Sequence, residues 1–490
     1  MSVSAPPRPP ASPRGTSAGV ILGEQPIRRP DTRSPKVMTR RAWWLVAMNF
    51  LVPGSAQVLA GNRRLGRVGL ASTLVMWVLV VLTLVAALVW PTLIVDLGVN
   101  GFVLLVVQFV LLAYAVLWVV LTVDTLRLVR LVKTRPGARP LVAVTAILGL
   151  VLGSGGAVYA AQQLLAPARE ALASIFTNNA PPVPPSNGYY NILLLGADSG
   201  LGRDSMRFDS ISVVSVNAET GAVHITGIPR DLAHVPFSAG PMQDLYPDGL
   251  EGHISQTCGW GPGINQLMNA VEVCREDRGA GLYPDAAANS STPAIEATKD
   301  AAEGILGIEI PYYAFVDMKG FADIVDALGG VDITVQERLP KGGGPAYDGQ
   351  SAEDWAIGWI EAGPQHMDGD TAQWYARSRY TTSDADRMRR QRELQQAILA
   401  QANPANVLTR FQEVAAAGED LVQTDIPSSL LGFFVNLAVK AKDQPVQTLE
   451  LTLDGAGIDT DKPTPEAYAH VRELIQQALY PPSPTPTPEG

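Results

Sequence analysis

Three long apolar stretches constrain this chain more than any other feature. Residues 68–90 and 101–123 are 23-residue stretches without a charged side chain, and residues 141–161 form a third that is rich in Gly and Ala. At ~1.5 Å per residue, each can cross a hydrocarbon core of ~30 Å as a helix. We therefore predict an all-α transmembrane region at residues 42–163.

The two halves of the chain carry opposite charge. Residues 1–170 hold 17 Lys and Arg against 5 Asp and Glu, whereas residues 171–490 hold 20 against 42. A basic half suits the anionic cytoplasmic side of a membrane, and an acidic half repels the phosphate backbone of nucleic acids. The charge therefore predicts membrane lipid as a partner and excludes general nucleic-acid binding.

The positive charges also predict the topology. Residues 1–41 hold eight Lys and Arg, the 61–67 loop three and the 124–140 loop five, and the positive-inside rule puts all of them in the cytoplasm. Residues 42–60, broken by a Pro-Gly pair, then dip into the membrane or lie at its interface. Three crossings make this a multi-pass protein of the cell membrane with an extracytoplasmic domain. The alternative, four crossings, would put the basic arm outside.

Pro-rich segments delimit that external domain. Residues 1–41 have the composition of a disordered basic arm. Residues 164–188 end in NNAPPVPPSNG and predict a linker, and residues 479–490 predict a disordered Pro-rich tail. The globular domain is therefore expected at residues 189–478.

The chain has only two cysteines, Cys258 and Cys274, which is too few for a Cys-rich zinc module. In an extracytoplasmic domain the pair can form a disulfide. The alternative is two free thiols, and the sequence leaves both open.

Three short apolar runs open the globular domain: NILLL (191–195), ISVVSV (211–216) and VHITGI (223–228). The last two are separated by NAETG, a spacing typical of an antiparallel hairpin. If all three strands are antiparallel neighbours, the end of the first, the start of the second and the end of the third meet at one edge of a sheet.

Charged residues lie at those strand ends. Asp198 follows the first run, Asp209 precedes the second, and Arg230 and Asp231 follow the third. Mg²⁺ prefers one or two carboxylates together with phosphate oxygens of a substrate. This edge is therefore a candidate site for Mg²⁺ (or Mn²⁺) and an anion. The alternative is that these are ordinary turn and surface residues.

An arginine-rich segment lies later in the domain. The sequence YARSRYTTSDADRMRRQRELQQAILAQ (375–401) holds six arginines between positions 377 and 392. A helix from about Arg387 turns by ~100° per residue. Its inward stripe would contain Arg387, Arg390, Gln391, Leu394 and Ile398. Its opposite side would contain Arg389, Arg392 and Gln396.

Inward arginines need an anionic partner, and guanidinium groups bind phosphate oxygens in a bidentate way. Ser383 or Asp384 can cap the start of the helix, where free N–H groups also favour anions. We therefore predict that the inward stripe faces a phosphate-bearing substrate, and that Arg389 and Arg392 face solvent.

Several motifs, taken in order, resemble one family. NILLLGAD, RFDSISVVSVN and IPRD are similar to the opening of the LytR-CpsA-Psr family. YYAFVDMKGFADIVDALGGVDITV (312–335) resembles its central segment, and WYARSRYTTSDADRMRRQ (374–391) resembles its arginine motif. The resemblance covers about residues 189–402 and continues more weakly to about residue 478.

The resemblance implies an α/β (α–β–α) domain with a central mixed sheet, an apolar pocket for a polyprenyl tail and a polar mouth for a diphosphate. It implies transfer of a phosphoglycopolymer from a polyprenyl diphosphate carrier to peptidoglycan. By matching positions, Asp198 and Asp209 would hold Mg²⁺. The residues that would contact phosphate are Arg207, Arg230, Arg377, Arg379, Arg387, Arg390 and Gln391.

The resemblance also implies catalytic roles for Arg230 and Arg387, and it leaves Asp231 and Asp384 as alternatives for the general base. One departure is that the family's Asn-Ala-Ala segment reads INQLMNAVE (264–272) here. Two other functions use the same features: hydrolysis of polyprenyl diphosphate, and a non-enzymatic membrane regulator or scaffold. The sequence contains no Walker A, HExxH or GxSxG motif.

Overall fold

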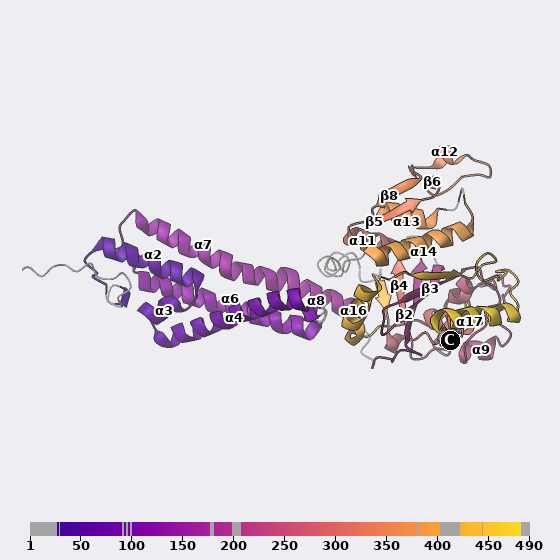
Figure 1. The fold of residues 1–490 in the computed structure, drawn as a ribbon, viewed down its shortest axis with the longest axis horizontal. Coiled ribbons are helices and arrows are strands. Elements are labelled where there is room, and N and C mark those ends of the chain that lie inside the picture. The colour runs from indigo at the N-terminus through magenta and orange to yellow at the C-terminus, as the bar shows by residue number, and fades with distance from the viewer. Residues whose placement is uncertain are drawn as a thin grey trace, which may run out of the picture. The chain divides into compact units, whose positions relative to one another are not determined.

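The computed structural model describes residues 27–28, 30–90, 93–94, 97–98, 100–176, 181–197, 207–378, 380, 382–401, 422–442 and 444–481 (Figure 1). They belong to two compact units. The first comprises residues 1–88 and 106–164, and the second comprises residues 89–105 and 165–490.

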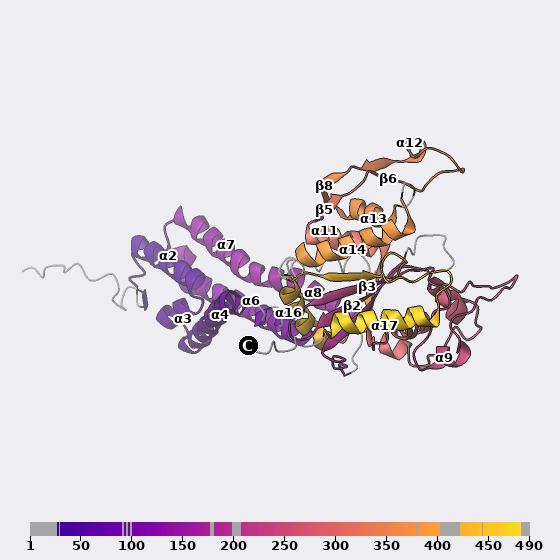
Figure 2. The same cartoon turned by 45° about the vertical axis from the view of Figure 1, so that its right-hand side comes forward.

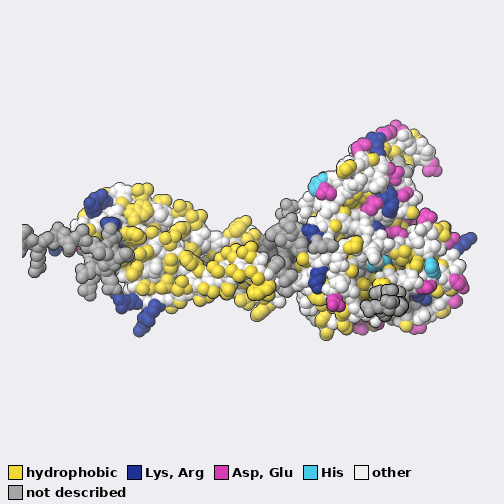
Figure 3. Space-filling model, viewed as in Figure 1, with side chains coloured by type: hydrophobic (Ala, Val, Ile, Leu, Met, Phe, Trp, Pro, Cys, Tyr) yellow, Lys and Arg dark blue, Asp and Glu magenta, His cyan; other side chains and the backbone are white. Residues whose placement is uncertain are grey.

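The first unit is helical. Its helices are α2 (Pro35–Leu51), α3 (Ser55–Ala60), α4 (Arg63–Val89), α6 (Gly101–Val129) and α7 (Ala138–Tyr159). Among the described residues, three helical stretches are long and apolar enough to cross a membrane, namely Arg63–Val89, Gly101–Lys133 and Ala138–Leu165. They overlap the three predicted spans. Hydrophobic side chains cover most of the visible face of this unit (Figure 3).

The segment before the first span is broken as its Pro-Gly pair predicts. Helix α2 ends at Leu51, and Gly54 precedes α3 with a φ of 97°. A Cβ at Gly54 would collide with the backbone of Leu70, so only glycine allows this close approach. Helix α2 begins at Pro35, however, so the prediction of a disordered arm up to residue 41 was wrong at its end. Apolar packing of α2 against α7 stabilises these residues as helix.

The globular domain begins where predicted, with β1 (Tyr189–Ala197). The predicted linker is shorter than expected, because a π-helical turn (Ala160–Leu165) and α8 (Ala166–Ile175) continue the chain as helix. Buried Leu172 and Ile175 give α8 an apolar side, which the Pro-rich end of the linker concealed.

The central sheet has six strands in the order β10-β3-β2-β1-β4-β9. Strand β2 (Phe208–Asn217) is antiparallel to both β1 and β3 (Val223–Ile228), as predicted. Strand β4 (Tyr312–Asp317) is parallel to β1, and β10 (Gln447–Glu450) is parallel to β3, whereas β9 (Val422–Thr424) is antiparallel to β4. The sheet is therefore mixed, as the resemblance implied.

Helices cover both faces of this sheet. Alternating strand residues such as Leu193 and Leu195 pack with α10 (Pro293–Leu306) and α17 (Pro465–Leu479). On the other face, Val223 and Ile225 pack with α14 (Asp384–Gln401) and α16 (Leu431–Ala441). Figure 2 shows α17 and α14 on opposite sides of the strands. The α–β–α architecture is confirmed.

A smaller cluster surrounds α14. It contains α11 (Met318–Leu328), α13 (Gly369–Arg377) and the pair β5 (Val331–Val335) and β8 (Gly363–Met367), packed through residues such as Val331, Tyr375 and Leu394. A second pair, β6 (Leu339–Lys341) and β7 (Gly358–Ile360), lies beside the short helix α12 (Ala352–Trp355). Gly329 ends α11 with a φ of 93°, in the left-handed region that favours glycine at this position.

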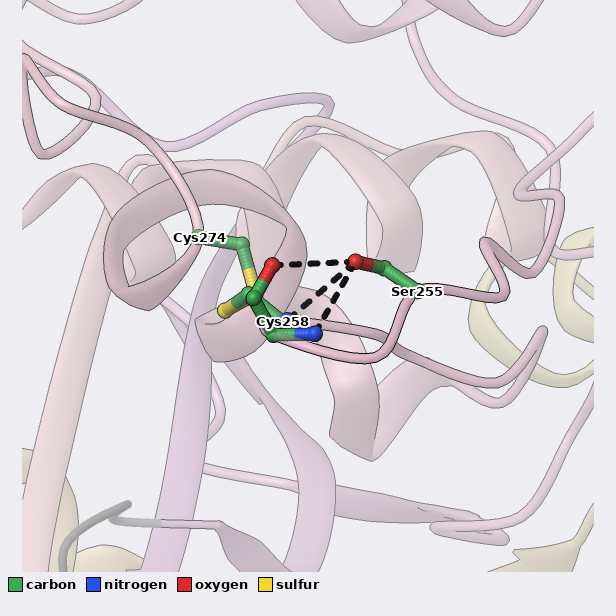
Figure 4. The surroundings of a disulfide bond; sticks show 4 residues. Ser255, Cys258 and Cys274 are labelled. Atoms are coloured by element: carbon green, nitrogen blue, oxygen red, sulfur yellow. Dashed lines mark hydrogen bonds between the residues drawn. A yellow bond between two sulfur atoms is a disulfide. The ribbon is translucent and has the colours of Figure 1, made fainter.

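The two cysteines form a disulfide between Cys258 and Cys274, which settles the alternative that the sequence left open (Figure 4). Ser255 lies beside it, and its hydroxyl accepts the backbone N–H of Cys258. The bond closes a loop that contains a 3-10 turn (Ile264–Gln266) and a π-helical turn (Asn269–Val273).

Candidate active site

A polar cavity of about 660 Å³ lies at the predicted edge of the sheet. The strand ends, the α13–α14 region and the loop closed by the disulfide all contribute to its wall. The side chains that sequence reasoning placed at the site and that line this cavity are Arg207, Asp209, Arg230, Asp231, Arg377, Arg387 and Gln391.

The centre of this cavity is a contact between two strand ends. Asp209 lies near the start of β2, and Arg230 follows the end of β3, so antiparallel pairing brings them together. Nη1 of Arg230 donates to Oδ1 of Asp209 at 2.5 Å, and its guanidinium lies 3.5 Å from Asp231 and 4.0 Å from Asp384. Three carboxylates thus surround one arginine.

These carboxylates keep Arg230 charged. Burial alone lowers the pKa of Arg230, but the hydrogen bond that Arg230 donates to Asp209 and the charges of Asp231, Asp209 and Asp384 outweigh it and raise the pKa. A permanent cation at the end of β3 is suited to binding a phosphate oxygen.

Helix α14 brings a second arginine to the cavity. Ser383 caps the helix, because its hydroxyl accepts the backbone N–H of Asp386 at 3.1 Å and donates to the Asp386 carboxylate at 2.7 Å. One turn later, Arg387 donates to Asp384 at 3.0 Å. Arg387 and Gln391 both line the cavity, as the helix phasing predicted.

Arg390 is inward-facing but lies outside this cavity wall. Its Nε donates to the carbonyl of Tyr375 at 3.0 Å, and Nη2 donates to the carbonyl of Ser378. Its side chain is only 2 % exposed, and burial lowers its pKa. These contacts hold the chain between α13 and α14, and the predicted contact of Arg390 with phosphate stays a prediction.

The prediction that Arg392 faces solvent was wrong. Arg392 is 4 % exposed, and its Nε lies 3.1 Å from Oε1 of Glu450 on β10. Burial lowers the pKa of Arg392 and raises that of Glu450, while their mutual attraction opposes both shifts. The physical reason is tertiary packing, because α14 contacts β3 and β10 and this contact covers Arg392. Arg389 does lie at the surface, paired with Glu393 at 2.6 Å.

Two cavity residues that sequence reasoning did not assign come from the disulfide-closed loop. The backbone N–H of Asn265 donates to the carbonyl of Arg230 at 3.0 Å, and its side-chain amide donates to Asp231 at 3.3 Å. Gln266 donates to the amide oxygen of Asn265 at 3.1 Å. The only sequence signal for these two residues was that the INQ segment stands where the family has its Asn-Ala-Ala segment.

Aromatic residues and glycines complete the polar wall. Trp374 and Tyr380 both line the cavity, and the Arg377 guanidinium lies 5.3 Å from the centre of the Trp374 ring. The Tyr380 hydroxyl donates to the carbonyl of Gly343, another lining residue, at 3.1 Å.

An apolar cavity of about 380 Å³ adjoins the polar one. It lies between the sheet and the helices α11 and α14, and its wall includes Leu194, Val214, Ile225, Phe321 and Leu394. Met318, Ala376 and Gln391 line both cavities, so the two spaces share a wall.

Two predicted site residues, Asp198 and Arg379, lie outside the described residues. Within the part of the chain that the structure describes, no group of three or more His, Cys, Asp or Glu side chains could hold a metal ion. Asp209 remains as a described carboxylate at the predicted metal position, paired with Arg230.

The fold and the site define a class. The LytR_cpsA_psr family model matches residues 162–244 and 287–475, which is more than half of the chain. The chain therefore belongs to the LytR_cpsA_psr family. Residues 245–286, which include the disulfide-closed loop, lie between the two matched stretches.

Among curated relatives, the chain is similar to the polyisoprenyl-teichoic acid–peptidoglycan teichoic acid transferase TagU of Bacillus cereus (strain AH820). The two are 27 % identical over 238 residues, which cover 48 % of this chain and 60 % of TagU. Biofilm regulatory protein A of Streptococcus mutans is 25 % identical over 276 residues, covering 55 % and 58 %. The chain thus spans about three fifths of the length of these relatives.

Solved structures of similar fold include TagV of B. subtilis, at 20 % identity and a TM-score of 0.40, covering 60 % of this chain and 98 % of TagV. Another is YwtF (TagT) with bound octaprenyl pyrophosphate lipid, at 19 % identity and a TM-score of 0.36, covering 62 % and 96 %.

Proposed function

We propose that this protein transfers a phosphoglycopolymer from a polyprenyl diphosphate carrier to peptidoglycan. The observation that carries the proposal is the shared wall of the two cavities. An arginine-lined polar space adjoins an apolar one, as a ligand with a diphosphate head and a prenyl tail requires. Membership of the LytR_cpsA_psr family and the name of the relative TagU support it.

In this proposal, Arg230 and Arg387 neutralise the diphosphate, and Arg207 and Arg377 extend the cationic wall. Phosphoryl transfer depends mainly on positioning and charge stabilisation, which guanidinium groups supply. The prenyl tail lies in the apolar cavity, and Gln391 lies at the boundary because it lines both spaces.

Asp231 is the proposed general base. Asp384 is held by Arg387 at 3.0 Å and its side chain is 39 % exposed, whereas the Asp231 side chain is 56 % exposed. Asp231 accepts the proton of an acceptor hydroxyl, whose oxygen attacks the phosphorus nearest the sugar. A new P–O bond forms as the bond to the departing polyprenyl phosphate breaks, and the electron pair leaves with that phosphate.

Mg²⁺ or Mn²⁺ at Asp209, together with Asp198, is a further part of the proposal. The carboxylate oxygens of Asp209 are hard donors on the wall of the polar cavity, which fits such an ion. The ion would neutralise phosphate charge when bound. Asp209→Asn should weaken binding of Mn²⁺ measured by electron paramagnetic resonance, whereas Asp354→Asn, an exposed carboxylate on α12, should not.

For orientation, we propose a cytoplasmic N-terminus, three crossings and an extracytoplasmic catalytic domain. The three apolar helices and the basic 61–67 and 124–140 loops support this. A reporter fused after Ser186 should be active only if it is of the type that works after export.

The transfer itself is tested with the full-length protein in lipid nanodiscs, a polyprenyl diphosphate-linked glycan, Mg²⁺ and peptidoglycan. We expect polymer attached to peptidoglycan and release of polyprenyl phosphate. Free phosphoglycan as the main product would instead indicate a hydrolase. No turnover would contradict enzymatic function and favour a regulator or scaffold.

A further inference from the structure

Helix α16 (Leu431–Ala441) has an apolar inner side that packs on the sheet. The Phe434 ring lies 5.1 Å from the Tyr190 ring and 6.4 Å from the Tyr312 ring, measured between ring centres. Leu437 and Ala441, on the same side of the helix, are buried. This spacing of three and four residues accounts for the contact with the domain.

The outer side of α16 is also apolar. Val439 is 39 % exposed, Ala438 is exposed and Val435 is half-buried, with Asn436 and Lys440 at one border of this side. Phe433, 38 % exposed, flanks it, and its ring also packs on Tyr190 at 5.4 Å between ring centres. A helix on the water-facing surface of a domain normally presents polar side chains on its outer face. An apolar outer face therefore indicates a partner that is itself apolar.

The apolar cavity identifies that partner. Ala441 of α16 packs with Val223 and Ile225, and these two residues line the apolar cavity. Met318 and Gln391, by contrast, lie where this cavity meets the polar one. The side of the cavity formed by β3 therefore adjoins α16, and a prenyl chain that entered from this side would come from the surroundings of this helix.

Charge agrees with a lipid surface. Lys440 and Lys442 lie at the C-terminal end of α16, although residues 171–490 carry 42 acidic and only 20 basic side chains. Nζ of Lys440 donates to the carbonyl of Glu219 at 2.9 Å, which holds one ammonium beside the helix. Two lysines bordering an apolar face are typical of a helix that lies in the headgroup region of an anionic bilayer.

We propose that α16 is an interfacial helix. Its outer side inserts among the lipids of the membrane that anchors the chain, with its lysines at the phosphate headgroups. The helix thus holds the β3 side of the apolar cavity at the bilayer, so that the prenyl tail passes into the cavity without crossing water. The second part rests on the proposed function; the first part does not.

The first test measures how deeply α16 lies in the bilayer. Full-length protein carrying a nitroxide at Val439→Cys is placed in nanodiscs containing phosphatidylglycerol, and Ile357→Cys, 79 % exposed on the loop before β7, serves as the control. Both native cysteines are in the disulfide and are not labelled. We expect the label at position 439 to collide more with oxygen than with a polar nickel reagent, and the label at 357 to do the reverse.

Two results would overturn the proposal. Equal access of the nickel reagent at both positions would place α16 in water. Protection of position 439 from both reagents would show that protein, either a second copy or another part of this chain, covers the helix.

The second test measures how membrane docking of α16 affects turnover. Val439→Glu should lower turnover of a long-chain polyprenyl diphosphate donor in nanodiscs about tenfold, a barrier change of ~1.4 kcal/mol. The same variant should turn over a short-chain, water-soluble donor at the wild-type rate, and Ile357→Glu should match wild type with both. Equal loss on both donors would contradict membrane docking, whereas a wild-type protein inactive on both would contradict the proposed function and leave the depth measurement standing.

Discussion

Arginine side chains have different partners in two regions around α14, the wall of the polar cavity and the side that packs on the protein. On the cavity wall, Arg230 and Arg387 lie beside carboxylates that are themselves partly exposed, and both border a large polar space. On the sheet side, Arg392 is buried against Glu450, and Arg390 donates to backbone carbonyls. The first pair borders the cavity in which we propose that a substrate phosphate binds, and the second pair contacts groups of the protein away from that cavity.

The difference shows that burial and helix phase do not assign a function to an arginine. Arg390 shares the stripe of Arg387, yet its partners are the carbonyls of Tyr375 and Ser378. An arginine in the cavity would stabilise a charge on the substrate, whereas an arginine paired with protein groups, such as Arg390 or Arg392, stabilises the position of its helix. Substitutions in the two regions should therefore affect different measurements.

The largest effect is expected for Arg392→Ala. Removing one partner leaves Glu450 as a buried unpaired charge, and the free energy of unfolding should fall by ~3–5 kcal/mol. The double variant Arg392→Met with Glu450→Met removes both charges and should recover most of that loss. Chemical denaturation of the full-length protein in detergent provides the measurement. If the double variant is no more stable than Arg392→Ala, the ion pair does not account for the effect.

Arg230→Ala is expected to act on turnover instead. Loss of a preorganised charge at the cavity centre should reduce kcat by about 10²–10³-fold. The matched control is Arg338→Ala, an arginine paired with Glu353 and Glu361 away from this cavity. Turnover and thermal unfolding should be measured together, because a parallel fall in stability would mean that Arg230 has a structural role like that of Arg390 and Arg392.

Loss of the disulfide should affect both stability and turnover. Breaking it by Cys258→Ser with Cys274→Ser opens a loop with a sequence separation of 16, which should cost ~3 kcal/mol of stability. Because Asn265 belongs to that loop and donates to Asp231, turnover should fall as well. Adding Asn265→Ala to the serine variant should then lower kcat little further, and a full additional loss would show that the loop keeps Asn265 in place without the disulfide.

A half-buried carboxyl outside both regions gives the smallest effect. Burial raises the pKa of Asp300 to about 6, although the Tyr283 hydroxyl, which donates to it at 2.5 Å, opposes this rise. A raised pKa means that the folded state binds the proton more tightly, so this stabilisation is complete below about pH 4 and is lost as the pH rises through about 6. Asp300→Asn should therefore raise stability at pH 8 by ~1–2 kcal/mol and change it little at pH 4. An equal change at both pH values would contradict this assignment.

Local sequence patterns were sufficient to predict which residues meet at the edge of the sheet. The strand spacing brought Asp209 to Arg230 because antiparallel neighbours fix which ends meet. Helix periodicity likewise placed Arg387 and Gln391 on the cavity wall. Both inferences depend only on residues within one hairpin or one helix.

Contacts between distant parts of the chain could not be predicted in this way. Glu450 lies on β10, far along the chain from Arg392, and nothing in the helix pattern indicates that strand as a neighbour. Asn265 reaches Asp231 through a loop outside the matched stretches of the family. Both were missed because tertiary packing, and not local periodicity, determines these partners.

The central claim is that the polar cavity directs an acceptor hydroxyl to the phosphorus nearest the sugar. The most direct measurement uses a polyprenyl diphosphate-linked glycan with ³²P only at that phosphorus, incubated with full-length protein and peptidoglycan. The account predicts that the label moves to peptidoglycan, that the released polyprenyl phosphate is unlabelled, and that Arg230→Ala slows the movement about 10²–10³-fold while Arg338→Ala leaves it unchanged. Label retained on the released lipid phosphate would mean attack elsewhere on the donor and would contradict the account.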